Sequence, residues 1–167
     1  MKGSINFIIH LFGFGFVFTA ILGGWILERR VCSEKDWSQK LFIGKISRRF
    51  GLLSPIASII MLLTGIVNIF NLHNGNINLL NIEGWLIAKI ILFAFLLTNG
   101  AVFGPILIRR RTKLIQGILE KTAPDDAETS IKIISKNIST FYFVQFLLLI
   151  IILYLSVAGG GKHPGII

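Results

Sequence analysis

The chain has 167 residues, of which 53% are hydrophobic and 15% are charged, and its mean hydropathy is +0.75. Soluble domains carry about 25% charged residues, so this composition argues against a water-soluble globular protein. The net charge of +9 would suit a nucleic-acid ligand, but nothing in the sequence resembles a basic surface interleaved with aromatic residues, and we expect no nucleic-acid partner.

Four apolar segments are long enough to cross a bilayer as helices, because a spanning helix needs about 20 mostly apolar residues. They are residues 5–27, 50–72, 84–108 and 138–158. The first is longer than the apolar core of a signal peptide, so we expect it to stay in the mature protein. The sequence therefore predicts one integral membrane domain over residues 1–167, an all-α four-helix bundle with four transmembrane helices in a lipid bilayer.

Each span carries one stripe of small or polar residues at helical spacing, which we call its interior stripe. In chain order the stripes are His10, Gly13, Val17, Ile21 and Gly24; Ser54, Ser58, Met61, Gly65 and Asn68; Lys89, Phe93, Leu96 and Gly100; and Tyr142, Gln145, Leu149, Ile152 and Ser156. Small residues let helix backbones approach, and polar residues find partners only inside a bundle. We therefore expect these stripes to face one another.

Local signals predict where the later helices begin. Ser33 and Asp36 are candidate caps for a second helix that starts before the membrane, and Pro55 predicts a kink within its span. Asn81 is the candidate cap of the third helix. Pro124 predicts the start of a long fourth helix that begins well before it enters lipid.

Positive charge is concentrated in two of the three connections between the spans. The connection 28–49 holds Arg29, Arg30, Lys35, Lys40, Lys45, Arg48 and Arg49, and the connection 109–137 holds Arg109, Arg110, Arg111, Lys113, Lys121, Lys132 and Lys136. Basic residues near the ends of spans stay in the cytoplasm. We therefore predict that 28–49 and 109–137 are cytoplasmic loops of a multi-pass plasma-membrane protein, with both termini extracytoplasmic. Cys32 then lies on the reducing side, where no disulfide forms.

Two ionisable side chains lie well inside the spans, and both helices enter from the outer side. His10 and Lys89 each lie about five residues into their span, which at 1.5 Å per residue is roughly 7–8 Å below the helix start. Asn68 reaches a similar depth near the outer end of the second span. Because ionisable groups inside a membrane usually mark function or a partner, His10, Asn68 and Lys89 are the predicted cofactor-binding cluster.

Several roles are open for these side chains. The His10 imidazole could be an axial ligand of haem iron or a ligand of copper, or a hydrogen-bonded core residue. Lys89 could pair with a haem propionate, or its long stem could reach the interface. His73 and His163 also fall on the predicted outer side, so a metal site that combines them with His10 is a further alternative, although their spacing matches no metal motif.

The order of these features resembles a known family. The features are His10 early in the first span, Arg48-Arg49-Phe50 before a second span with Pro55 and Thr64-Gly65, and Gly84-Trp85-Leu86-Ile87-Ala88-Lys89 at the start of the third. Together they resemble the copper-resistance-D and DUF2269-like four-helix membrane proteins, and more distantly the HemJ-type protoporphyrinogen oxidases. In that oxidase branch, the resemblance assigns the functional histidine and lysine to His10 and Lys89. The chain has Asn99 and Gly100 where that branch has a further histidine.

Two kinds of function follow from these observations. The first is an accessory subunit, without catalytic activity of its own, that packs against other membrane subunits of a copper- or haem-containing oxidase or monooxygenase. The second is a stand-alone redox or metal-handling membrane protein that binds haem b or copper through His10. An absorption spectrum and a metal analysis of the isolated chain would separate them. The sequence carries no motif for hydrolysis.

Overall fold

The computed structural model describes residues 2–51, 53–72 and 83–160. These residues form α1 (Lys2–Ser33), α2 (Trp37–Gly51), α3 (Leu53–Leu72), α4 (Gly84–Leu119) and α5 (Ala127–Gly160), and contain no strand. Four helical stretches are long and apolar enough to cross a membrane: Ile5–Ser33, Trp37–Phe70, Gly84–Leu119 and Ala127–Gly159. The predicted all-α bundle with four membrane-crossing helices is therefore confirmed, with α2 and α3 together forming the second crossing.

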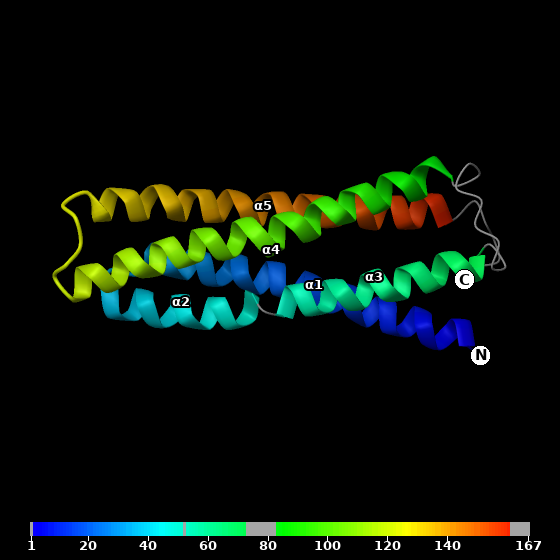
Figure 1. The fold of residues 1–167 in the computed structure, drawn as a ribbon, viewed down its shortest axis with the longest axis horizontal. Helices are drawn as coiled ribbons and strands as arrows, with labels where there is room; N and C mark the ends of the chain where they lie inside the picture. The colour runs from blue at the N-terminus through cyan, green and yellow to red at the C-terminus, as the bar shows by residue number, and fades with distance from the viewer. Residues whose placement is uncertain (1, 52, 73–82, 161–167) are drawn as a thin grey trace.

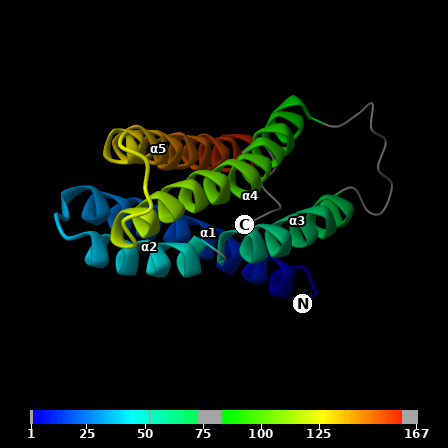
Figure 2. The same cartoon turned by 60° about the vertical axis from the view of Figure 1, so that its left-hand side comes forward.

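The helices run side by side along one long axis (Figure 1). We call the end with residues 34–36 and 120–126 the hairpin end, and the end where α1 begins and α5 finishes the terminal end. The α1 helix packs on α3 and α5, and α4 packs on α5 and α2. Within the described ranges, α1 and α4 share no backbone contact, so they are diagonal across the bundle. Figure 2 shows α3 and α4 separating toward the terminal end.

The helices are longer than the apolar spans. In the connections 28–49 and 109–137, all residues except 34–36 and 120–126 are helical. The early starts predicted for the second and fourth helices are confirmed, and α1 and α4 also continue past their apolar segments. A helix of 36 residues, such as α4, is about 54 Å long, whereas the hydrocarbon core is about 30 Å thick. The hairpin end therefore projects beyond the lipid as a packed helical structure.

The turn between α1 and α2 is fixed by local side-chain contacts. The Asp36 carboxylate accepts the Ser38 N–H at 2.9 Å and caps α2, as predicted. The Ser33 hydroxyl instead donates to the Arg30 carbonyl at 3.0 Å, so Ser33 belongs to the end of α1 and its predicted capping role is wrong. The backbone N–H groups of Lys35 and Asp36 hold the pKa of the Glu34 carboxyl below its ordinary value.

The other helix starts differ in detail from the prediction. The N-cap of α4 is Glu83, and the predicted cap Asn81 lies outside the described residues. The carbonyl of Pro124 accepts the Ala127 N–H at 3.0 Å, so the proline forms the turn that precedes α5. Pro55 is the third residue of α3, and the predicted kink falls next to residue 52, which lies outside the described residues.

The interior stripes face one another as predicted, and no member is exposed. The core at the centre of the bundle consists of Val17, Ile21, Ala57, Met61, Leu96, Leu149 and Ile152. Glycines bring the helices close at several points. A Cβ atom at Gly13 would lie 2.8 Å from Met61, and one at Gly104 would lie 2.9 Å from Phe141. The predicted small-residue seams therefore exist, with α1 closing on α3 and α4 closing on α5.

Candidate functional site

His10 lies on α1 and is held by α3. Its Nδ1 atom lies 2.8 Å from the Thr64 hydroxyl oxygen, and that hydroxyl donates its own hydrogen to the Ile60 carbonyl at 2.7 Å. The Thr64 oxygen must therefore accept, so Nδ1 is the donor. The His10 ring also has a hydrogen-bond contact with the Met61 backbone. Nε2 is the ring nitrogen that Thr64 does not hold.

Asn68 belongs to the same cluster, but its partner is not His10. The Asn6 amide, one helical turn before His10 on α1, donates to the Asn68 side-chain oxygen and, at 3.0 Å, to the Thr64 carbonyl. Asn6 was not predicted as a site residue, although its spacing from His10 places both on one face of α1. The two asparagines and the His10–Thr64 contact together link α1 to α3 at the terminal end.

Lys89 approaches this group from α4. Its side chain is partly buried and lies at the same end of the bundle as His10 (Figure 1). No ion pair or hydrogen bond to Lys89 occurs within the described part of the chain. The structure thus brings His10, Asn68 and Lys89 to the same end of the bundle. Together with Asn6 and Thr64 we call them the histidine cluster.

The donor set of the histidine cluster suits some ligands better than others. Residues 2–51, 53–72 and 83–160 contain no group of three or more His, Cys, Asp or Glu side chains that could hold a metal ion. His73 and His163 lie outside the described residues. A bare copper ion needs several protein ligands, whereas a haem iron, held already by its porphyrin, needs one axial imidazole, and a cation can pair with a propionate. His10 and Lys89 fit the second requirement.

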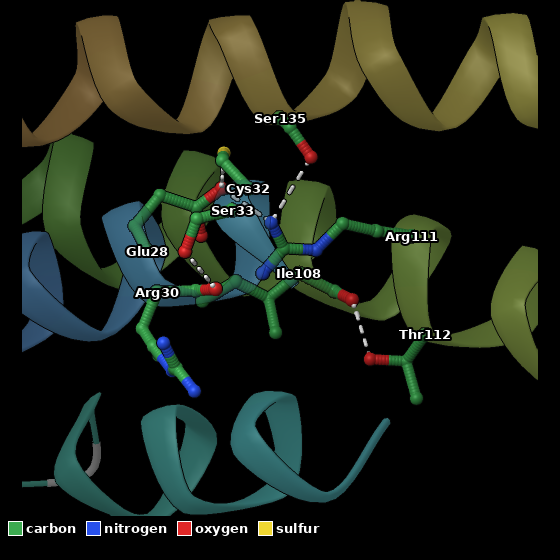
Figure 3. A network of polar contacts seen from close by, with 8 residues as sticks. All are labelled: Glu28, Arg30, Cys32, Ser33, Ile108, Arg111, Thr112 and Ser135. Carbon is green, nitrogen blue, oxygen red and sulfur yellow. Dashed lines mark hydrogen bonds and ion pairs between the residues drawn. The ribbon is translucent and has the colours of Figure 1, made fainter. Parts of the chain in front are cut away.

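A second polar site lies inside the hairpin end, and sequence reasoning missed it. Glu28 of α1 and Arg111 of α4 are 0% and 1% exposed and form an ion pair through Oε1 and Nη1. Figure 3 shows the guanidinium pointing between Glu28 and Ser135 of α5, and Nη1 also donates to the Ser135 hydroxyl at 3.2 Å. We call these three residues the ion-pair cluster. It joins the diagonal helices α1 and α4, which have no direct backbone contact.

Further polar groups surround the ion-pair cluster. The Cys32 thiol lies 3.6 Å from Glu28 Oε1, and the Tyr142 hydroxyl faces Ser47 of α2. Glu28 Oε2 and Arg111 Nη2 are buried without a hydrogen-bond partner. Removing one member of a buried ion pair typically costs about 3–5 kcal/mol, because the other charge is left uncompensated. The cluster therefore constrains how α1, α4 and α5 pack.

From the sequence, Arg111 is counted among the basic residues that predict a cytoplasmic connection. The first predicted span ends at residue 27, one residue before Glu28. A usable signal was present, since the interior stripes continue beyond the apolar segments. Glu28 follows Gly24 by four residues and Ile21 by seven, and Arg111 follows Gly104 by seven. Both charges therefore lie on interior faces, which helical periodicity alone could have indicated.

Comparisons of this chain with protein-family models, with curated proteins and with solved structures give no match.

Proposed function

We propose that this protein binds haem b at the terminal end of the bundle, with His10 as the axial ligand. The supporting observation is the orientation of the imidazole. Thr64 accepts the Nδ1 hydrogen, so Nε2 is the ring nitrogen that would serve as the ligand. Histidines that bind metals are held in this way, with the other ring nitrogen hydrogen-bonded to a fixed acceptor.

Other members of the histidine cluster have defined tasks under this proposal. The Lys89 ammonium group pairs with a propionate, since it lies near His10 and has no partner in the described structure. The Asn6–Asn68 contact keeps α1 and α3 in register, which fixes the position of the imidazole relative to Lys89. Bound haem would supply one-electron redox chemistry.

This proposal favours the stand-alone reading over an accessory subunit of an oxidase or monooxygenase. It agrees with the resemblance to the copper-resistance-D and DUF2269-like proteins, which is carried by His10, Pro55 and the segment from Trp85 to Lys89. We propose that the chain is a distant relative of that family. A copper site gains no support, because the described residues provide a single imidazole at this end.

We further propose that the hairpin end faces the cytoplasm and that the termini lie on the opposite side of the plasma membrane. The basic residues of the hairpin end support this orientation, since positive charge next to spans is retained in the cytoplasm. The histidine cluster then lies toward the extracytoplasmic side.

The test is an absorption spectrum of the full-length chain, purified in neutral detergent from cells supplied with a haem precursor. A Soret band and about one haem per chain in the pyridine haemochrome assay are expected. His10→Ala should remove the band, and Thr64→Val should weaken haem binding about 10- to 100-fold, because the imidazole loses its orienting acceptor.

Matched controls are His73→Ala and His163→Ala, which remove the other imidazoles of the chain and should leave the band unchanged. Thr98→Val, at an exposed position of α4, is the control for Thr64→Val. A colourless protein that co-purifies with larger membrane subunits would refute haem binding and support the accessory reading. A Soret band that survives His10→Ala would refute the assignment of the ligand.

A further inference from the structure

A pocket of about 290 Å³ lies at the hairpin end, between α2 and α4. Its lining consists of Gly44, Lys45, Arg48, Arg109, Thr112, Lys113 and Gln116. Four of these side chains are cationic and none is acidic. The pocket belongs to neither the histidine cluster nor the ion-pair cluster.

The four cations of the pocket have no counterion within the described structure. The ion pairs found there are Arg111 with Glu28 and Arg30 with Glu34, so other basic residues of the hairpin end do have acidic partners. Four positive charges gathered in one pocket repel one another. Their arrangement is favourable when an anion occupies the space between them.

The pocket lies where lipid headgroups are expected. Arg109 directly follows the apolar span 84–108 of α4, and Arg48 lies five residues before Leu53, the first residue of the apolar helix α3. The hydrocarbon layer ends at the ends of these apolar segments, and the phosphate groups of the lipids begin there. Basic pockets between membrane helices at this level bind anionic headgroups.

Gly44 forms part of the wall of the pocket. Its backbone is buried, yet a Cβ atom built on it would meet nothing within 4 Å. A side chain at residue 44 would therefore enter open space. A larger residue would enter the pocket without removing any of the four cations.

We propose that this pocket binds the headgroup of an anionic phospholipid that carries two phosphates, such as cardiolipin. Arg48 and Arg109, on facing helices, hold the phosphate oxygens through their planar guanidinium groups, and Lys45 and Lys113 add charge. A single phosphate would leave most of the four charges uncompensated, whereas two phosphates on one headgroup neutralise more of them. The proposal does not depend on haem binding.

The experiment is a lipid titration of the full-length, delipidated chain in neutral detergent, followed by native mass spectrometry. One cardiolipin should bind with an affinity at least about tenfold higher than that of phosphatidylglycerol at equal phosphate concentration. Replacing Arg48 and Arg109 together by Gln should weaken cardiolipin binding about 30-fold, since each cation near the surface contributes about fivefold. Gly44→Leu should weaken it at least about tenfold with all cations in place, because the leucine fills the pocket.

Two control variants match these changes. Replacing Lys132 and Lys136 by Gln removes the same charge from a second pocket, between α1 and α5, and should change the affinity less than about threefold. Gly15→Leu adds the same side chain at an exposed position of α1 with nothing within 4 Å, and should change nothing. Circular dichroism and thermal unfolding without lipid verify that each variant is folded.

Several results would overturn the proposal. If the Lys132/Lys136 variant loses as much cardiolipin affinity as the Arg48/Arg109 variant, the lipid is held by diffuse electrostatic attraction and not by this pocket. Equal affinity for phosphatidylglycerol would contradict the two-phosphate headgroup. Displacement of the lipid by inorganic pyrophosphate at similar concentration would identify a site for a free phosphate compound. Unchanged binding in the Arg48/Arg109 variant would exclude this pocket.

Discussion

An isolated charge at either Glu28 or Arg111 would be strongly destabilising, because both side chains are closed off from solvent. The pair survives because Oε1 and Nη1 meet directly and Ser135 takes a further hydrogen of the guanidinium group. The pairing is incomplete, since Glu28 Oε2 and Arg111 Nη2 have no partner. A buried ion pair with unmet hydrogen-bonding capacity fixes a geometry more than it adds net stability.

We therefore predict that Arg111→Met lowers the free energy of unfolding by about 3–5 kcal/mol, because Glu28 is left buried without a counterion. The double variant Glu28→Leu with Arg111→Met should recover most of this loss, since no charge is then buried. Chemical denaturation in a defined detergent, monitored by circular dichroism, measures both effects.

The control for this prediction is Arg30→Met. Arg30 pairs with Glu34 across one helical turn, but its side chain is 65% exposed, so the pair contributes about 0.5 kcal/mol or less. A loss in Arg111→Met no larger than that in Arg30→Met would contradict the role given to the ion-pair cluster. A double variant Glu28→Leu with Arg111→Met that is less stable than Arg111→Met alone would also contradict it.

At the scale of the helices, α1 and α5 approach closely at a residue without a side chain. A Cβ atom at Gly24 would lie 2.5 Å from the Tyr142 ring, which is itself 6% exposed and packs with Ile108 and Ile138. At the neighbouring Gly23, the nearest atoms to a Cβ would be those of Phe50 at 3.6 Å, an ordinary van der Waals distance. A methyl group therefore fits at Gly23 but clashes with Tyr142 at Gly24.

We predict opposite outcomes for the same substitution at these two positions. Gly23→Ala should raise the free energy of unfolding by up to about 1 kcal/mol, because alanine favours helix over glycine and no contact opposes it. Gly24→Ala should lower it by about 1–3 kcal/mol, because the methyl group forces the Tyr142 ring to move. Thermal unfolding of both variants in the same detergent measures the difference. Equal shifts would mean that α1 and α5 do not approach as closely as the structure has them.

At the scale of the whole molecule, the two ends of the bundle carry different chemistry. The terminal end holds the histidine cluster, where α3 and α4 separate (Figure 2). The hairpin end holds the ion-pair cluster and the basic pocket, and its helices continue past the apolar segments. The proposed ligand site and the proposed lipid-headgroup contact thus lie at opposite ends of one set of helices.

The proposed orientation predicts which end is accessible from outside the cell. In a Cys32→Ser background, a membrane-impermeant maleimide should label Gly84→Cys, at the exposed start of α4, in intact cells. It should label Thr122→Cys, in the exposed turn before α5, only after permeabilisation. The reverse pattern would place the hairpin end outside, and labelling of both positions in intact cells would contradict a membrane-spanning bundle.

The sequence by itself determined the four crossings and the interior face of each, because apolar length and helical periodicity are local properties of the chain. It also placed His10, Asn68 and Lys89 at one depth, because depth follows from distance along a helix. The partners of these residues required the tertiary structure. Asn6 rather than His10 holds Asn68, and Glu28 meets Arg111, because the order of the helices around the bundle decides which stripes face each other. The pocket at Gly44 likewise exists only where α2 lies against α4, a contact between segments that are distant in sequence.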